Sequence, residues 1–260
     1  MVSAYIILGA AGSGRREVLA DLLENGTPAG DARATAGCVR LYLADDAFTT
    51  GDGTGGGGTG GVAFPKTVEI RRWSVAGGNV SLDAPESAPE TVFLVTDGRA
   101  NPVDQMEILA ALLPRLGWEV ARIITVVNCA LLAANPALAD WFKACVHFSD
   151  AALLARRESV PNAWVAKFVA GFKDECNPCL FEFVKGGRVA NAPRVLVPEA
   201  RRLSMIFDDT DGLDEMEFDE NNLPDEPFDI KPGTDPWFER APNGARRLPL
   251  PDIREFLERK

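Results

Sequence analysis

Continuous apolar runs, each followed by a helical pattern, restrict this chain to few architectures. Strand-like runs occupy 3–8, 91–96, 121–127, 151–154 and 180–184, with a shorter one at 194–197. Helical patterns lie between them, at 16–24, 104–113, 135–145 and 161–173. Strands that are apolar on both faces and separated by helices belong in a parallel sheet covered on both sides. The sequence therefore predicts a three-layer α/β fold with a mostly parallel sheet.

Composition separates a folded body from a C-terminal arm. The chain has 260 residues, 46% of them hydrophobic, which is enough to bury a sizeable core. We expect the α/β domain to span 1–200 and an acidic, Pro-rich extended arm to span 201–260, with a short helix in its last ten residues. Within the body, 51–61 holds eight glycines and predicts a mobile loop. The expected aromatic anchors of the arm are Phe207, Phe218, Phe228, Trp237 and Phe238.

The acidity of the chain is local. Its formal charge is -11, yet 208–229 contains eleven Asp or Glu and no Lys or Arg, and the remainder carries 27 charges of each sign. Binding to nucleic acid or to an anionic membrane needs a basic excess that neutralises phosphates, so neither partner is expected. The acidic stretch is interpreted as a solvated segment that lies over arginines such as Arg201-Arg202 or Arg246-Arg247, or that binds a protein partner.

Cysteine usage and the N-terminal residues predict a cytoplasmic protein. Five cysteines, an odd number in a long chain, argue against a disulfide scaffold, and the first residues lack the pattern of a secretory signal. The pair Cys176 and Cys179 has C-x-x-C spacing, but it follows a helix and precedes a strand, unlike a redox site, and zinc would need two more ligands. We interpret both as structural thiols. The single histidine, His147, is interpreted as a packed or surface residue.

A glycine-rich turn joins the first strand to the first helix and predicts an anion site. The segment GAAGSGRR, 9–16, stands where G-x-x-x-x-G-K-[ST] forms a phosphate cradle from backbone N–H groups. The predicted nucleotide- or phosphate-binding residues are Gly9, Ala11, Gly12, Ser13, Gly14, Arg15 and Arg16.

Two substitutions in this turn count against magnesium-dependent hydrolysis. Arg15 replaces the expected Lys and can still hold a phosphate bidentately, but Arg16 replaces the hydroxyl that would ligate Mg²⁺. Two cations at a helix N-terminus oppose the macrodipole, and a bound phosphate would reverse that effect. The alternative is that both arginines turn into solvent or pair with carboxylates such as Glu17.

Asp97 is a weak catalytic candidate. It follows the run 91–96, at the strand end where open α/β sheets place ligands. Its carboxylate could hold a cation or orient a water molecule. It could equally cap the turn that continues through Gly98.

Four segments in order resemble the CobW-like metallochaperone GTPases. They are GAAGSGRRE, VTDGRANP (95–102), ITVVNCALL (124–132) and HFSDAALLARRES (147–159). The resemblance covers about residues 3–160 and implies a P-loop NTPase-like fold with an ancestral GTP site. In the last segment it places Arg156 at the family's Lys position and Glu158 at the Asp position, which implies weak base recognition. The family's metal-binding C-x-C-C is missing and Cys38 stands alone, so metal insertion is not implied.

The leading functional hypothesis is a degenerate P-loop GTPase-like protein with weak or lost hydrolysis. It would bind GTP, another nucleotide or phosphate, with Mg²⁺ doubtful, or would bind a protein partner. One alternative is an active GTPase, ATPase or phosphotransferase in which Arg15 clamps a phosphate and Asp97 holds a metal or acts as base. Another is a pure scaffold. The sequence leaves the partner and the oligomeric state open.

Overall fold

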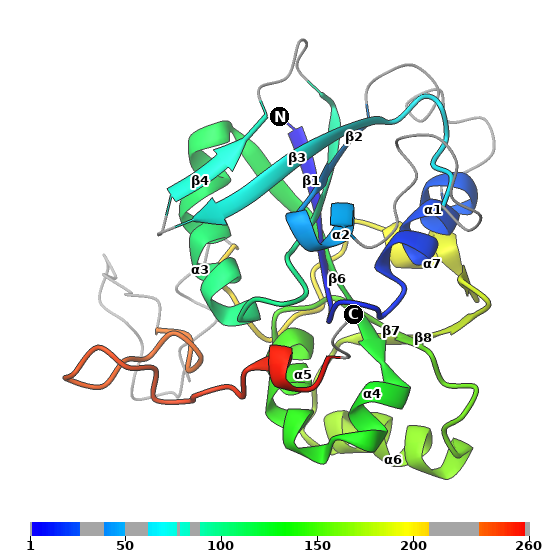
Figure 1. Ribbon diagram of the computed structural model, residues 1–260, viewed down its shortest axis with the longest axis vertical. Helices are drawn as coiled ribbons and strands as arrows, with labels where there is room; N and C mark the ends of the chain where they lie inside the picture. Colours follow the sequence, from blue (N-terminus) through cyan, green and yellow to red (C-terminus); the bar gives the residue numbers. More distant parts are fainter. Residues whose placement is uncertain are drawn as a thin grey trace, which may run out of the picture.

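The computed structural model describes residues 2–26, 39–49, 62–76, 79–83, 89–207 and 234–257. The segments 51–61 and 208–229, and with them Phe218 and Phe228, lie outside the described residues, as does Cys38. Within the described ranges, one nine-stranded sheet forms the centre of the fold (Figure 1). Its strand order is β4-β3-β2-β5-β1-β6-β7-β8-β9.

The sheet is parallel from β3 to β8 and antiparallel only where β4 and β9 join its two edges. The central strand β1 lies between β5 and β6, with Ile7 opposite both Val95 and Ile124. The carboxyl ends of these three strands therefore meet at one edge. The strands are β1 (Val2–Leu8), β2 (Val39–Leu43), β3 (Glu69–Ala76), β4 (Asn79–Leu82), β5 (Thr91–Val95), β6 (Trp118–Asn128), β7 (Ala151–Ala155), β8 (Leu180–Lys185) and β9 (Arg188–Val189).

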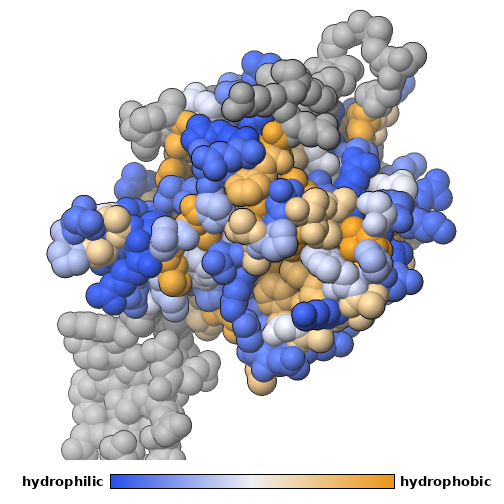
Figure 2. All heavy atoms as spheres, turned by 60° about the horizontal axis from the view of Figure 1, so that its bottom comes forward, coloured by the Kyte–Doolittle hydropathy of each residue, from blue (hydrophilic) through white to orange (hydrophobic). Residues whose placement is uncertain are grey.

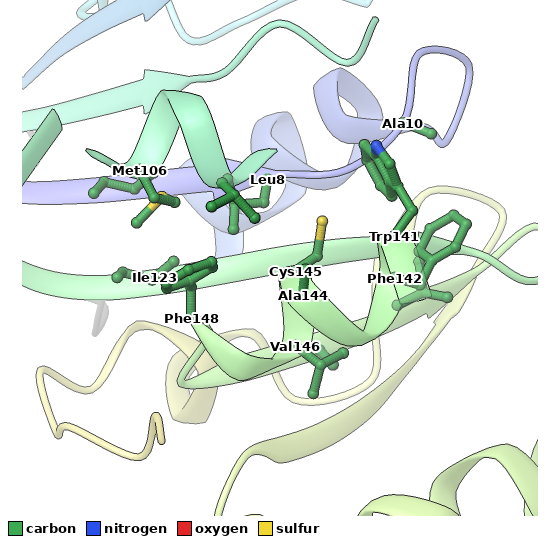
Figure 3. Packing of buried hydrophobic residues seen from close by; sticks show 14 of the residues in the cluster. Leu8, Ala10, Met106, Ile123, Trp141, Phe142, Ala144, Cys145, Val146 and Phe148 are labelled. Atoms are coloured by element: carbon green, nitrogen blue, oxygen red, sulfur yellow. The ribbon is translucent and has the colours of Figure 1, made fainter. Parts of the chain in front are cut away.

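Helices cover both faces of the sheet and make two separate hydrophobic layers. On β1, Ile6 and Leu8 point into one layer and Ile7 into the other. The first layer contains residues of α3, α4, α5 and α6, part of which Figure 3 shows around Met106 and Phe148; the second contains residues of α1 and α7. The helices are α1 (Arg15–Asn25), α2 (Asp45–Thr49), α3 (Pro102–Leu112), α4 (Cys129–Ala134), α5 (Ala139–His147), α6 (Asn162–Asp174) and α7 (Ala192–Leu196).

The predicted α/β class and mostly parallel sheet are confirmed, and the five main apolar runs are β1, β5, β6, β7 and β8. The strand expected at 194–197 is wrong. That segment belongs to α7, because the Asn191 side chain accepts a hydrogen bond from the Arg194 N–H at 3.4 Å and Pro193 occupies the first turn. The strands β2, β3 and β4 were not predicted.

The helix expected at 135–145 is in fact two elements, a 3₁₀ turn at Pro136–Leu138 and α5. Asn135 does not cap them, because its amide group donates to the Leu131 carbonyl at 2.9 Å instead. The unpredicted helix α4 is capped by Asn128, whose side chain accepts the Leu131 N–H at 3.0 Å.

The C-terminal residues 234–257 pack against the α3 and α5 side of the body. The ring of Phe238 stacks on Phe148 with 5.5 Å between centroids, and Arg246 pairs with Asp104 and Glu107. Of the last ten residues, for which a helix was expected, the structure describes those up to 257, and they contain a 3₁₀ turn at Ile253–Glu255. The predicted anchors that fall within the described residues, Phe207, Trp237 and Phe238, all pack against the first hydrophobic layer.

Two of the arginines expected to face the acidic stretch have partners in the body. Arg246 pairs on α3 as described above, and Arg202 pairs with the fully buried Asp150. The division into 1–200 and 201–260 stays a prediction. In the part of the chain that the structure describes, no helix combines the length and apolar character of a membrane span.

Candidate functional site

The turn between β1 and α1 lies at the carboxyl edge of the sheet and needs its glycines. Gly9, Gly12 and Gly14 have φ of +137°, +77° and +92°, a region that other residues rarely adopt. A Cβ on Gly9 would also lie 2.5 Å from the Val126 carbonyl oxygen. Gly14 is the N-cap of α1, and among the described residues no side chain caps that end of the helix.

The inside of this turn is filled by the protein itself. The Ala11 N–H donates to the Gly98 carbonyl at 3.0 Å, and the Ser13 N–H donates to Ala10 at 3.1 Å. The backbone of Gly98 presses so closely on the turn that a Cβ there would lie 2.3 Å from the Ala11 nitrogen. Figure 3 shows the indole of Trp141, a member of the same hydrophobic layer, pointing toward Ala10. Two amides of the expected phosphate cradle are therefore bonded to protein carbonyls.

Arg15 points into the molecule, where its guanidinium group donates to the Thr96 carbonyl and to the Asp46 carboxylate. Arg15 is 6% exposed and the Asp46 side chain 2%. The predicted phosphate-binding cation thus has a buried carboxylate partner supplied by α2. Glu17, the carboxylate that the sequence suggested as a partner, pairs with Arg156 instead.

Arg16 is also buried and holds the same region. Its guanidinium group lies 4.9 Å from the centre of the Phe64 ring and donates to the Ala47 carbonyl at 3.4 Å. Together, Arg15 and Arg16 attach the start of α1 to the residues around α2. Neither side chain offers an oxygen atom to a metal ion.

Asp97 caps the turn after β5. Its Oδ1 accepts the Arg99 N–H at 2.8 Å, and Gln105 holds the Asp97 backbone through hydrogen bonds of 2.7 Å and 2.9 Å. Burial raises the pKa of Asp97, the hydrogen bond from the Arg99 N–H opposes this shift, and the Asp46 charge adds to it. Gln105 was missed by the sequence analysis; its one signal was a polar residue on the buried face of the helix at 102–112.

A pocket of about 230 Å³ opens beside the turn, and two of the predicted phosphate-binding residues, Ser13 and Gly14, line it together with the predicted base-recognition residues Arg156 and Glu158. The other five predicted phosphate-binding residues do not line it. A second pocket of about 420 Å³ shares Glu158 with it and reaches Lys185. The first pocket is lined by Ser13, Gly14, Glu17, Val18, Ala155, Arg156, Glu158, Val184, Gly186 and Gly187.

His147 takes part in a structural contact with the C-terminal residues. Its Nε2 lies 2.9 Å from Asp235 Oδ2, which also accepts the Ser204 hydroxyl at 2.5 Å. The serine thus donates to the aspartate, whereas a Ser-His-Asp triad needs a serine that donates to the histidine. This arrangement fits the interpretation of His147 as a packed residue.

The two cysteines of the C-x-x-C segment have different environments. Cys176 is exposed with φ of +55°, while Cys179 is buried and its thiol contacts the Leu180 carbonyl at 3.8 Å. Burial raises the pKa of Cys179, which disfavours a reactive thiolate. No cluster of three or more His, Cys, Asp or Glu side chains suited to a metal ion occurs within the described residues.

Comparisons with known proteins add little to this geometry. No family model matches the chain, and no curated protein matches it. Among solved structures, the Zn(II)-bound YjiA GTPase of E. coli aligns with 77% of this chain at 9% sequence identity and a TM-score of 0.37. The alignment spans 66% of the length of that chain. A likeness this low is too weak to support a conclusion about activity.

Proposed function

We propose that this chain is a P-loop-type binding protein that does not hydrolyse nucleotides. The observation that carries the proposal is the inward orientation of Arg15. A cation that serves phosphoryl transfer must face the phosphates, whereas Arg15 is paired with Asp46 in a site from which water is almost excluded. Breaking one partner from a buried ion pair costs about 3–5 kcal/mol. The guanidinium group is therefore a structural part of the turn.

The residues at the turn do not fit Mg²⁺. This ion takes oxygen ligands in an octahedral arrangement, but the hydroxyl position of the motif holds Arg16, whose guanidinium group packs against Phe64. The nearest buried carboxylate, Asp46, accepts from Arg15. Two guanidinium groups beside a divalent cation would repel it, so no step of a metal-assisted hydrolysis is supported here.

Ligand binding would take place in the pocket beside the turn. Gly14 and the start of α1 line this pocket together with Glu158. A phosphate beside Gly14 and a base beside Glu158 could belong to one nucleotide, with GTP the first candidate because of the segment resemblance. We expect the nucleotide to bind weakly and without Mg²⁺. We also expect the protein to be cytoplasmic and to act by binding a protein partner.

Calorimetric titration with GTP, GDP and ATP, each with Mg²⁺ and with EDTA, tests the proposal together with a phosphate-release assay on the same samples. We expect binding that is insensitive to Mg²⁺ and no phosphate release. Micromolar, Mg²⁺-dependent GTP binding with turnover would overturn it.

An active enzyme is the second candidate, and the environment of Asp97 favours it. Burial raises the pKa of this carboxyl at the carboxyl end of β5, and such shifts are concentrated at functional sites. If phosphate release is found, Asp97→Asn should abolish it. A release rate unchanged by that substitution would exclude Asp97 as the base.

A further inference from the structure

We infer that Arg156, rather than Arg15, is the cation that contacts the phosphate of a ligand in the pocket beside the turn. The inference rests on the proposed function, because it takes the same pocket as the binding site. It changes the role that the sequence suggested for Arg156, which was recognition of the base.

The position of Arg156 is the first step. Its guanidinium group lies against the turn, so that a Cβ on Gly14 would be 3.3 Å from Nη2. The same Nη2 donates to Glu17 at 2.8 Å. Both side chains line the pocket. A guanidinium group therefore stands at the mouth of the turn, next to the uncapped N-terminus of α1.

The energies of the two arginine pairs differ enough to decide which one exchanges its partner. The side chains of Arg156 and Glu17 are 49% and 40% exposed, and exposed pairs contribute little to stability. Removing one partner of a buried pair such as Arg15–Asp46 leaves an uncompensated buried charge and is strongly destabilising. A phosphate that arrives in the pocket can thus displace Glu17 from Arg156 easily, but it cannot draw out Arg15.

The backbone at Arg156 has an uncommon conformation. Its φ of +52° is rare for a residue with a side chain, and the Arg156 carbonyl accepts a 3.0 Å hydrogen bond from the Ala130 N–H. Ser13, which also lines the pocket, is fully buried, and its hydroxyl has no hydrogen-bond partner among the described residues. A buried hydroxyl without a partner is unfavourable, so a shift of the turn that exposes it to a ligand oxygen would relieve this cost.

The charges around the pocket define the ligand class. Arg156 and the N-terminus of α1 attract an anion beside Gly14 once Glu17 is displaced from Arg156, while Glu158, which also lines the pocket, accepts N–H donors. The fitting ligand combines a phosphate with hydrogen-bond donors. This is the chemistry of a nucleoside phosphate, and guanine supplies a donor edge of this kind.

Calorimetric titration of the full chain with GDP and with inorganic pyrophosphate tests the assignment. Arg156→Asn removes the charge, and Asn tolerates a positive φ. We expect it to weaken both probes at least about tenfold, since a hydrogen bond to a charged group contributes about 1.5–3 kcal/mol. Glu17→Gln removes the competing carboxylate, so it should strengthen both probes by a few fold.

Arg157→Asn is the matched control. This neighbour loses the same charge, but its guanidinium group lies 4.6 Å from the centre of the Phe183 ring and lines only the second pocket. We expect it to change affinity less than about twofold. Equal losses in both variants, an unchanged Arg156→Asn, or no binding of either probe to the native chain would each overturn the assignment. Phosphate release in the same samples reports separately on the proposed absence of hydrolysis.

Discussion

The guanidinium group of Arg15 and the carboxylate of Asp46 form a buried ion pair between the start of α1 and α2, in the position where a P-loop presents its cation to phosphate. The Arg15 guanidinium group also donates a hydrogen bond to the Thr96 carbonyl at the end of β5. The Arg15 side chain thus joins α1, α2 and the end of β5 at the carboxyl edge of the sheet. The turn therefore contributes to stability, whatever ligand the adjacent pocket takes.

Asp46→Asn should destabilise the fold by about 3–5 kcal/mol, because it leaves the buried Arg15 charge without its partner. Asp45→Asn, on the exposed face of the same helix, should cost less than about 1 kcal/mol. Urea denaturation measures both. Equal destabilisation by the two substitutions would contradict the importance of the pair.

Gly98→Ala should destabilise the protein by about 1–3 kcal/mol, because its Cβ would meet the Ala11 nitrogen at 2.3 Å and force the turn to shift. Gly171→Ala is the control, and it should change the stability in the opposite direction. A Cβ there meets nothing within 4 Å, and replacing a helical glycine stabilises by about 0.5–1 kcal/mol. Melting temperatures of the two variants should therefore move in opposite directions. A neutral Gly98→Ala would show that the turn can move away from Gly98 at little cost, against the close packing described here.

The sequence could predict the strands that are apolar on both faces, but it could not predict β2. That strand buries Arg40, which is 1% exposed, and a charged residue breaks the apolar pattern. Its burial depends on the Glu69 carboxylate, which accepts from Arg40 Nε at 2.7 Å. Glu69 lies on β3, 29 residues away, and no local pattern reports such a pairing.

The same limit applies to the site. The glycine spacing predicted where the turn would form, and the strand–turn–helix context predicted its place at the sheet edge. The partner of Arg15 could not be predicted, because Asp46 is 31 residues away and only the order β2-β5-β1 brings it close. The pairing of Arg156 with Glu17 likewise spans 139 residues and depends on the approach of the β7 end to α1.

Asp97→Asn should raise the melting temperature at neutral pH. Burial raises the pKa of Asp97, so its ionised form disfavours the folded state above the folded pKa. That cost is relieved as the pH falls through the folded pKa, and it is absent below the ordinary Asp value of about 4. Asn keeps an oxygen that can accept the Arg99 N–H. Melting curves at several pH values should therefore show a stabilisation that disappears in acid; a destabilised variant at neutral pH would contradict this sign.

Asp235→Asn should have the opposite effect and loosen the C-terminal residues. Burial opposes the charge of Asp235, but hydrogen bonds from His147 and Ser204 outweigh it and lower its pKa. Its ionised form thus stabilises the folded state above the unfolded pKa of about 4, and this contribution is lost as the pH falls through the folded value. We expect a cost of about 1–3 kcal/mol at neutral pH, because buried hydrogen bonds to a charged group are weakened.

Asp252→Asn is the control for this contact, since Asp252 forms an exposed pair with Arg254 within the same C-terminal segment. Such an exposed pair contributes little to stability, so this variant should melt close to the native chain at neutral pH. Hydrogen exchange of residues 234–257 should increase in Asp235→Asn at neutral pH. The reason is that loss of the His147–Asp235 contact weakens the adjacent stacking of Phe238 on Phe148. Unchanged exchange in Asp235→Asn would mean that the aromatic contacts and the pairs of Arg246 with Asp104 and Glu107 hold the segment without the His147 contact.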